Sequence, residues 1–478
     1  MAEHQESSSK KQKLSSIKDN NSGDSENEDR LSSLPDSILA DILSLLDIPS
    51  AVATSVLSRR WRYLWTQVTH LDIDYDDFES LVSEDDYFSK VSNTVDHILR
   101  QCSSPKINTF NLRIEHPFMD EEFETTQRYI VSWITLFCSR FVNQLKVDVF
   151  DTGMPRFPVP VCVYQSVNLS KLELRGPFAC VLSDSLAIHL PNLKSLVLDS
   201  VDIAPDLIGK LTKSCPLLES LDLHLNGAEN AVVMNISALN LNSLVVFLGG
   251  NTGNWKHCQV VIDAPKLERV SLGGRLACYQ FANNRNTLLH AKLDFDRSTF
   301  EAGSDYLSHL AKLLQEISCV GSIHIVGALR MFNPINYVVA NIWKTFHNLT
   351  RICLIHPSLH QVMFSDAPIP ACLLAKVKWI KLDDLKGDEN DIWLLNYILS
   401  NAEVLEEILV DVPTVEYLGG SEQDQLWWEL NFCKELFELP RKSSTCDIKF
   451  SGSFVDSSSN DYRHGSIACR LEWSLWGS

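Results

Sequence analysis

The sequence lacks the short motifs by which common catalytic sites are recognised. It has no Walker loop to cradle phosphate, no G-x-S-x-G turn to carry a nucleophilic serine and no H-E-x-x-H pair to hold zinc. His356 and His360 are four residues apart, but Pro357 disrupts the start of a helix and no glutamate follows His356. No cysteine has an obvious histidine partner in sequence. We therefore expect no catalytic residue, no metal and no cofactor.

Positive charge is also scarce. Lysine and arginine total 42 against 61 aspartate and glutamate residues, which gives a formal net charge of −19. A protein that binds nucleic acid or an anionic membrane needs a basic face. The charge balance therefore argues against both classes of partner.

Two further absences concern the compartment. The 13 cysteines include no C-x-x-C pair, and their odd number and wide spacing indicate reduced, mostly buried thiols. No apolar run approaches the length of a membrane span, and the first residues are polar. We expect neither a signal peptide nor an anchor, and we predict a location in the cytoplasm, the nucleus or both.

The most informative stretch runs from Leu34 to Trp65 and reads LPDSILADILSLLDIPSAVATSVLSRRWRYLW. Its first part carries apolar residues at three- and four-residue steps, which predicts a helix with one wide apolar stripe. Pro49 should end that helix. We expect Ser50 to cap a second short helix and Ser58 a third. Three helices of this size cannot bury so much apolar surface alone, so the surplus indicates a partner.

This stretch resembles an F-box, with its Leu-Pro opening, its Ile/Leu-rich first helix and its Ser-Arg-Arg-Trp third helix. The resemblance implies an F-box over residues 30–68 that docks on a Skp-type adaptor and thereby on a cullin–RING ubiquitin ligase. It also implies that Val56, Trp61 and Trp65 mainly hold the three helices together. The alternative is an ordinary helical cap that packs on the domain behind it. The implied adaptor-binding residues are Leu34, Pro35, Ile38, Leu39, Ile42, Leu43 and Leu46.

A second pattern begins near Ile107, in which an apolar residue is followed three and five positions later by two more. In its clearest copies the middle residues are Leu172, Leu196, Leu221, Leu244 and Val270, at steps of 23 to 26 residues. Steps of that size match a leucine-rich repeat, in which each turn supplies one short strand and a returning segment. We also expect Val131 to Val142 to form a helix on the convex side.

The Asn ladder of the commonest repeat type is missing, so we predict an irregular solenoid over residues 105–365, of the type found behind plant F-boxes. The alternative is an α/β domain with several parallel strands. Alternation along the strands places the variable residues on the face of the sheet that points away from the core. In the central strands these residues form no basic pocket, which disfavours a small-molecule receptor of the hormone-binding kind. They are Glu173, Val197, Asp222, Val245 and Ser271.

The last third has its own signature, from Pro370 to Val410. The motifs Cys-Leu-Leu, Lys-Gly, Asn-Tyr-Ile-Leu and Asn-Ala-Glu-Val-Leu follow in the order found in the FBD domain, which this region resembles. We expect a strand at Ile380–Leu382, a helix at Asp388–Asn401 and another strand near Ile408. Residues 366–452 would form an FBD domain that closes the solenoid, because a terminal repeat needs a cap.

Two polar segments complete the organisation. Residues 1–29 have almost no apolar content and should be a disordered tail; Lys10, Lys11 and Lys13 in it are a candidate nuclear import signal. Eight acids lie between Asp72 and Asp86. They begin like a calcium-binding EF-hand loop but lack its glycine and its final glutamate, so we expect an acidic surface loop.

The predicted fold is therefore α/β, with an N-terminal three-helix F-box, an irregular leucine-rich-repeat solenoid and an FBD-type segment that closes it. The predicted function is non-catalytic: the substrate-recognition subunit of an SCF-type ubiquitin ligase, which binds a Skp-type adaptor through the F-box and an unknown protein substrate through the repeats. The alternative is a non-degradative scaffold that uses the same adaptor contact.

Overall fold

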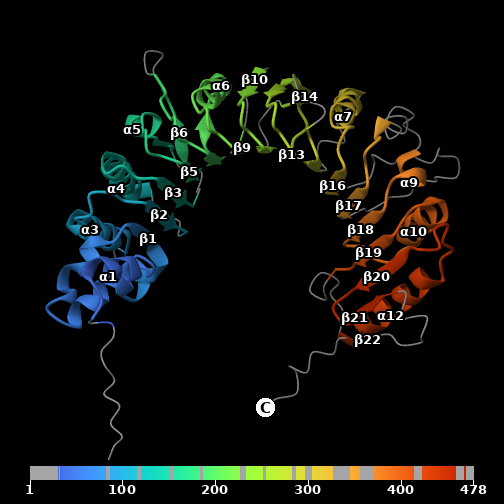
Figure 1. Ribbon diagram of the computed structural model, residues 1–478, viewed down its shortest axis with the longest axis horizontal. Helices are drawn as coiled ribbons and strands as arrows, with labels where there is room; N and C mark the ends of the chain where they lie inside the picture. The colour runs from blue at the N-terminus through green and yellow to red at the C-terminus, as the bar shows by residue number, and fades with distance from the viewer. Residues whose placement is uncertain are drawn as a thin grey trace, which may run out of the picture.

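The chain forms an arch in which strands line the inner side and helices cover most of the outer side (Figure 1). This computed structural model describes residues 31, 33–81, 87–115, 120–150, 155–182, 187–226, 233–250, 255–282, 287–295, 304–326, 345–355, 371–413, 422–458 and 468–469. The predictions for residues 1–29, for Lys10, Lys11 and Lys13 and for His356 and His360 fall outside the described residues.

The N-terminal segment folds into short helices, as predicted, but two of the expected caps are wrong. Helix α1 spans Asp36–Leu43, α2 Ile48–Ala53, and the 3-10 helices η1 and η2 span Thr54–Val56 and Trp61–Gln67. Asp47, not Ser50, caps α2, because its carboxylate accepts the Ser50 N–H at 2.7 Å. The third predicted helix is the 3-10 helix η2, which begins at Trp61, so Ser58 does not occupy its N-cap position, and no side chain caps it.

One long sheet follows the whole arch. Among the described residues it has 16 strands in sequence order, and every pair up to β20 is parallel. Only the last two strands are antiparallel to their neighbours. The strands are β1 His70–Asp74, β2 Thr109–Ile114, β3 Gln144–Val149, β5 Lys171–Arg175, β7 Ser195–Asp199, β9 Ser220–Asn226, β11 Ser243–Gly249, β13 Arg269–Gly274, β15 His290–Phe295, β16 Ser322–Val326, β17 Arg351–Ile355, β18 Trp379–Asp383, β19 Glu407–Asp411, β20 Asp447–Ser451, β21 Val455–Ser458 and β22 Ala468–Cys469.

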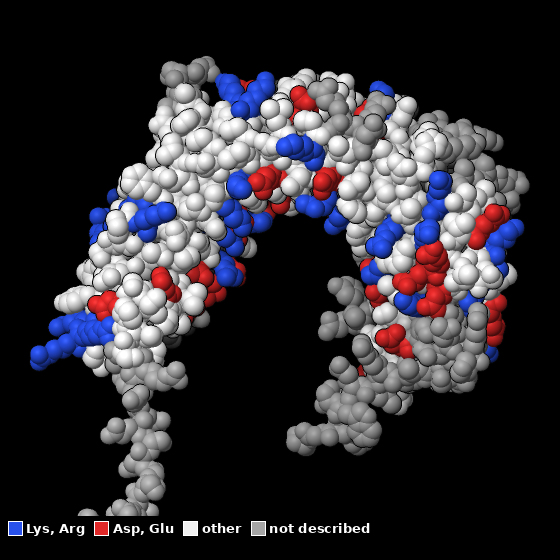
Figure 2. Space-filling model, viewed as in Figure 1, with Lys and Arg blue, Asp and Glu red and all other residues white. Residues whose placement is uncertain are grey.

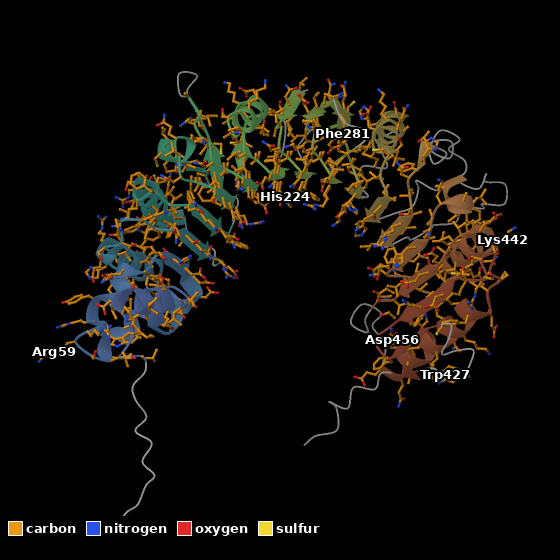
Figure 3. The ribbon with its side chains drawn as sticks, viewed as in Figure 1. Arg59, His224, Phe281, Trp427, Lys442 and Asp456 are labelled. Atoms are coloured by element: carbon orange, nitrogen blue, oxygen red, sulfur yellow. The ribbon has the colours of Figure 1, made fainter. Side chains whose placement is uncertain are left out.

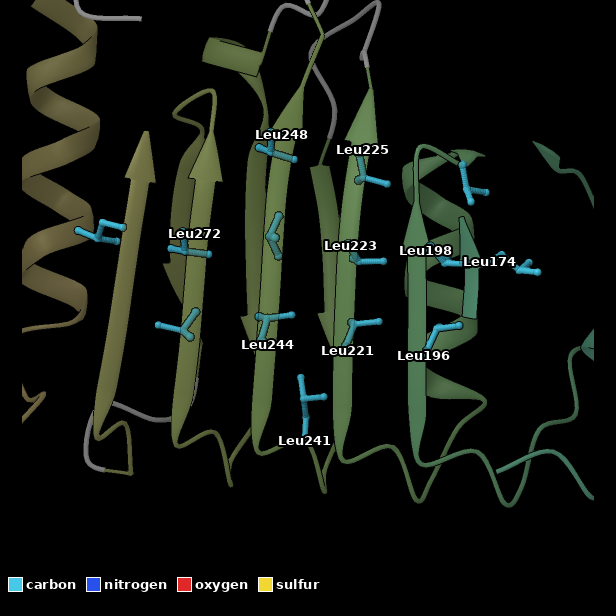
Figure 4. Packing of buried hydrophobic residues seen from close by; sticks show 14 of the residues in the cluster. Leu174, Leu196, Leu198, Leu221, Leu223, Leu225, Leu241, Leu244, Leu248 and Leu272 are labelled. Carbon is cyan, nitrogen blue, oxygen red and sulfur yellow. The ribbon is translucent and has the colours of Figure 1, made fainter. Parts of the chain in front are cut away.

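The repeat pattern read from the sequence coincides with the register of this sheet. Leu172, Leu196, Leu221, Leu244 and Val270 are paired strand by strand in that order. All five are at most 4% exposed and belong to the hydrophobic core, and Figure 4 labels three of them, Leu196, Leu221 and Leu244, on neighbouring strands. The predicted repeat unit is therefore confirmed for the central strands, because period-2 alternation sends one apolar set into the core.

The returning segments differ from turn to turn, which makes the solenoid irregular. Some turns return through helices and others through short strands. The helices are α3 Tyr87–Gln101, α4 Asp120–Ser139, α5 Val161–Tyr164, α6 Pro205–Lys213, α7 Ser304–Glu316, α9 Ala371–Ala375, α10 Glu389–Asn401 and α12 Glu422–Glu438, with the 3-10 helices η3 Tyr75–Leu81 and η4 Trp255–His257. Two small parallel sheets complete the outer layer: β4 Phe157–Pro158 with β6 Phe178–Cys180 and β8 Asp202–Ile203, and β10 Val233–Ser237 with β12 Gln259–Asp263 and β14 Cys278–Phe281.

The C-terminal third continues the same sheet. Strands β18, β19 and β20 add to it in parallel, and α10 and α12 pack beside them. The helix predicted over Asp388–Asn401 is α10, and Asp388 caps it by accepting the N–H groups of Asn390 and Asp391. In the part of the chain that the structure describes, the sheet stays open at both ends. That residues 366–452 act as a cap stays a prediction.

Candidate functional site

Exposed apolar side chains concentrate on the N-terminal helices. Seven of the 19 large exposed apolar side chains of the described residues lie between residues 31 and 63. Such a concentration of exposed apolar side chains on a protein surface is typical of a contact with another protein. We call these seven the apolar face: Leu31 (52% exposed), Ile38 (44%), Leu45 (84%), Leu46 (39%), Val56 (85%), Leu57 (65%) and Tyr63 (64%).

Helix α1 divides its wide apolar stripe between the core and solvent. Leu39 and Leu43, which are 0% and 1% exposed, pack inward with the core that contains Trp61 and Trp65. Ile38 and Ile42 are one turn apart and lie on the adjacent, outward side of the helix; Ile38 is exposed and Ile42 half-buried. The apolar stripe is therefore wider than the contact between α1 and the core, and its outer half is accessible to a partner.

The seven predicted adaptor-binding residues thus fall into three groups. Pro35, Ile38 and Leu46 are exposed, and Leu34 and Ile42 are half-buried. Leu39 and Leu43 are buried in the core, so in this structure they can support the apolar face only from beneath.

Polar contacts fix α1 in place at both ends. Arg60 forms an ion pair with Asp36 at 2.7 Å and also donates to the Leu34 carbonyl, which ties the Leu-Pro opening to the Ser-Arg-Arg-Trp segment. At the other end, the Ser44 hydroxyl donates to the Ala40 carbonyl and accepts the N–H of Thr69. Because both ends are held, the outward side chains of α1 are presented on a fixed scaffold.

Sequence reasoning missed part of the apolar face and misplaced Val56. Trp61 and Trp65 are 8% and 6% exposed and hold the helices together as expected, but Val56 is 85% exposed and cannot do so. The missed residues are Leu31, Leu45, Leu57 and Tyr63. Leu45 lies seven positions after Ile38, so extending the helical stripe by one turn would have found it.

The N-terminal helices and the first strands share one core, which contains Leu43, Val68 and Leu71. A cavity of about 330 Å³ lies at the junction, between the end of α1 and the amino ends of the first strands. Its lining includes Leu45 and Leu46 from the apolar face and His70, Thr109 and Lys171 from three strands. The adjoining Val68 and Leu71 are fully buried. The apolar face therefore has a fixed position relative to the inner side of the arch.

The inner face of the sheet carries the residues that alternate with the buried ones. Charged side chains gather along this inner edge (Figure 2). In the N-terminal half they pair: Arg113 with Asp74 at 3.1 Å and Arg175 with Asp199 at 3.0 Å. His224 lies 3.1 Å from Asp222, and this hydrogen bond raises the pKa of the imidazole above its usual value.

The five variable residues that were predicted to point away from the core do not all reach solvent. Asp222, Val245 and Ser271 are half-buried, whereas Glu173 and Val197 are only 8% exposed. Lys171 covers Glu173 through an ion pair at 2.6 Å. The parallel strands place these side chains about 5 Å from their neighbours, so long side chains cover short ones.

The described residues contain no group of three or more His, Cys, Asp or Glu side chains arranged to hold a metal ion. Asp72, which begins the EF-hand-like run, accepts a hydrogen bond from Asn111, and Asp74 pairs with Arg113. Within the same residues, none of the helices combines the length and apolar character required to cross a membrane.

Comparisons with known proteins give matches to both the N-terminal helices and the central repeats. A family model of the F-box domain matches residues 31–71. A second family model, for the LRR repeats of FBD-associated F-box protein At5g56370, matches residues 130–292. These two matches cover the apolar face and the central repeats respectively.

Among curated proteins, several Arabidopsis thaliana sequences are similar along almost the whole chain. F-box/LRR-repeat protein 13 is 24% identical over 457 residues, which covers 89% of this chain and 96% of that protein. F-box/FBD/LRR-repeat protein At5g56420 is 25% identical over 444 residues, which covers 88% of this chain and 99% of that protein. F-box/LRR-repeat protein At3g59200 is 30% identical over 280 residues, or 58% of this chain and 51% of that protein.

Proposed function

Because the chain belongs to the plant family of F-box/FBD/LRR-repeat proteins, we propose that it is the substrate receptor of an SCF-type cullin–RING ubiquitin ligase. In this role the F-box binds a Skp-type adaptor, and the inner face of the repeats binds a protein substrate. The chain itself is non-catalytic, and other subunits transfer ubiquitin. The observation that carries the proposal is the apolar face on helices that an F-box model matches.

The chemistry of the apolar face supports an adaptor contact. Its exposed side chains are aliphatic or aromatic. They lie on α1, on the residues directly before and after it and on the segment from η1 to η2, together with the half-buried Leu34 and Ile42. Burial of such side chains is the main favourable term in protein association. A few central ones usually carry most of the affinity. We place Ile38, Ile42 and Leu45 at that centre, because Ile38 and Ile42 lie on the outward side of α1 and Leu45 follows two residues after the helix ends.

The test measures adaptor affinity for the full chain and for an Ile38→Ala/Ile42→Ala variant. Alanine favours helix, so α1 should remain folded. Removal of two buried aliphatic groups typically costs a few kcal/mol, so we expect the dissociation constant to rise roughly a hundredfold. Val161→Ala is the matched control, because Val161 is 49% exposed and lies on α5, away from the F-box.

Unchanged adaptor affinity in the double variant, with a melting temperature equal to that of the wild type, would contradict the proposal. The same experiment separates a ligase receptor from a scaffold when it is repeated in cells. Cullin should co-purify with the adaptor and the wild-type chain, and it should be lost with the double variant. Adaptor binding without cullin would favour the scaffold.

A further inference from the structure

The inner face of the arch changes character between its two halves. In the strands from β13 to β18, the first and third positions hold basic or uncharged residues and no acid. The basic residues at these positions are Arg269, His290, Lys292, His324, Arg351 and Lys381. We call these six residues the basic stretch. The protein as a whole carries a net charge of −19. A local run of basic side chains, four of them lysine or arginine, therefore stands out against the rest of the surface.

The register of the sheet brings these side chains together. Lys292 pairs in register with His324, His324 with Cys353, and Cys353 with Lys381. The neighbouring row lies on four successive strands and consists of Arg269, His290, Ser322 and Arg351, paired in register in that order. Adjacent strands are about 4.8 Å apart, so each row spans roughly 14 Å. The two rows form one surface although their residues are about thirty positions apart in sequence.

Three of the cations take part in no ion pair, although the pKa of the Glu407 carboxyl, which a hydrogen bond from Lys449 lowers, is lowered further by the nearby charge of Arg351. Arg269, Lys292 and Arg351 form no ion pair with any described residue. Arg351 instead lies over the ring of Trp379, 5.8 Å from its centroid, and Arg269 donates to the amide oxygen of Asn242 at 3.4 Å. Lys381, by contrast, pairs with Asp383 and Asp411 at 3.0 and 3.2 Å.

His324 lies between these charges with an unused polar atom. Its Nε2 is buried and has no hydrogen-bond partner among the described residues. Burial lowers the pKa of His324, and the charges of Lys292 and Lys381 lower it further, while Asp383 and Asp294 act in the opposite direction. A buried polar atom without a partner is costly, which marks this position as one that a bound acceptor or donor would satisfy.

An aromatic side chain borders the basic stretch. Phe247 on β11 is 37% exposed, although its strand neighbours Val246 and Leu248 are fully buried. Its ring stacks on His224 with centroids 5.4 Å apart, at the inner edge of the arch, where Figure 3 labels His224. On its other side the ring packs against Gly273, where a Cβ would lie 2.8 Å from the Phe247 ring, so this close approach requires a glycine. Phe247 therefore offers an apolar contact on the strand next to β13, in the register row of Gly273 and Asp294 rather than in the two rows that hold the cations.

We propose that the inner face from β11 to β18 binds an acidic, extended segment of a protein partner, with an apolar side chain of that segment against Phe247 and its carboxylates on Arg269, Lys292 and Arg351. The proposal rests on the receptor function above and specifies its substrate class. Six strands span about 24 Å, which about seven extended residues cover. Opposite charge steers such a segment to this face, and the negative remainder of the surface repels it.

A polypeptide fits this surface better than a nucleic acid. Asp294 and Asp383 follow the basic residues on their own strands, and Asp411 lies on the next strand. These carboxylates would repel a continuous line of phosphates. A peptide can place neutral residues opposite them. Phe247 also suits an apolar side chain, because aromatic anchors are frequent at the centre of protein interfaces.

The experiment uses the full chain and short fluorescent peptides in an anisotropy titration. The peptides share one sequence around a central leucine and differ only in whether the flanking positions are Glu, Gln or Lys. We expect the Glu peptide to bind roughly tenfold or more tightly than the Gln peptide, and added salt should reduce that preference. Equal affinity for the Glu and Gln peptides would overturn the proposal.

Two variants locate the site. Lys292→Glu/Arg351→Glu should abolish the preference for the Glu peptide. Lys434→Glu/Lys442→Glu makes the same charge change at an exposed position of α12 and at Lys442, which Figure 3 labels on the outer side, and should preserve the preference. Phe247→Ala should weaken binding of all three peptides, whereas Trp427→Ala, which removes an aromatic ring that is 69% exposed on α12, should not. A preference that survives the first charge reversal would contradict the assigned location.

Two further measurements separate this inference from the receptor function and from nucleic acid. Adaptor affinity should be unchanged in every one of these variants, because their residues lie far from the F-box. Loss of adaptor binding by the F-box variant tests the receptor function alone. A single-stranded oligonucleotide of matched length serves as a third anionic probe. Tighter binding of that probe than of the Glu peptide would replace the peptide proposal.

Discussion

Two carboxylates of the C-terminal third are buried and are held by backbone amides rather than by cations. Glu429 on α12 is fully buried and accepts the N–H groups of Ser453, Phe454 and Val455 at 2.9 to 3.0 Å. Gln425 donates to the same carboxylate at 2.8 Å. Through these bonds one side chain fixes the turn between β20 and β21 against α12.

We expect Glu429→Ala to destabilise the chain strongly. The substitution leaves three backbone donors without their acceptor, and each buried unsatisfied group costs about 1–3 kcal/mol. We therefore expect a loss of roughly 3 kcal/mol or more in the free energy of unfolding, measured by urea denaturation. Glu435→Ala, an exposed position on the same helix, is the control and should change stability by less than about 0.5 kcal/mol. Similar losses in the two variants would refute this account of Glu429.

Asp391 makes stability depend on pH. It is 5% exposed and accepts the N–H groups of Lys386 and Gly387 at 2.7 and 3.0 Å. Burial, together with the nearby Asp388 carboxylate, raises its pKa from 3.8 to about 6, against the opposing effect of the two amides. Because the pKa of Asp391 in the folded state lies above that in the unfolded state, the stability that the protonated carboxyl contributes is fully present below the unfolded-state pKa. It is lost as pH rises through about 6.

The predicted size of this effect is about 3 kcal/mol, since one pKa unit corresponds to about 1.4 kcal/mol. Asp391→Asn keeps an acceptor oxygen but cannot ionise. We expect the free energy of unfolding of this variant, relative to wild type, to increase between acidic and neutral pH. The exposed Glu389→Gln on the same helical turn should show no such increase. A wild-type–variant difference that stays constant from about pH 4 to about pH 7 would show that Asp391 is not the group responsible.

At the scale of the elements, the last strands have the same role as the repeats before them. Strand β17 pairs with β18 through Ile352 with Ile380 and Leu354 with Leu382. All four side chains are at most 6% exposed. The antiparallel strands β21 and β22 come only after this parallel series. The region that resembles the FBD domain therefore shares one sheet and one core with the repeats.

A chain that ends at Ser365 should aggregate or unfold in part. Its last described strand would be β17, with an unpaired edge and an apolar layer open to water, and edges of that kind associate with other chains. Size-exclusion chromatography and thermal melting would measure the effect. A chain that ends at Ser458 keeps β20 and β21 and is the control. If the shorter chain is monomeric and melts like the full protein, the C-terminal third is an independent unit that recruits a partner.

At the scale of the whole molecule, the arch follows from stacking turns that contact mainly their neighbours. Strands lie on the inner side and bulkier helices on most of the outer side, so successive turns rotate in one sense (Figure 1). The apolar face lies at one end of the arch and the basic stretch lies beyond its middle. A partner bound at the F-box therefore leaves the inner face accessible.

Solution scattering should detect this shape. A compact globule of this length would have a radius of gyration of about 23 Å. We expect a clearly larger value and a distance distribution with an extended tail. The same measurement on a chain that starts at Arg30 removes the contribution of the polar N-terminal segment. A symmetric distribution with the globular radius would contradict the arch and favour the α/β alternative.

The sequence by itself determined the F-box segment, the position of the repeats and the strand residues that enter the core. These features depend on short-range periodicity, which Leu196, Leu221 and Leu244 display directly in their spacing. The strand and helix of the last third, including the start of the helix near Asp388, were predictable for the same reason. Each depends on neighbours within a few positions of the chain.

Only the tertiary structure decided which half of an apolar stripe is available and which charges meet. Ile38 and Leu39 are alike in the sequence, but packing of η2 against one side of α1 buries Leu39 and leaves Ile38 exposed. Glu429 would be read as a surface residue until the β20–β21 turn supplies its donors. Lys292 and Arg351 become one surface only through strand register. Burial and charge density depend on residues distant in the chain, and periodicity contains no information about those contacts.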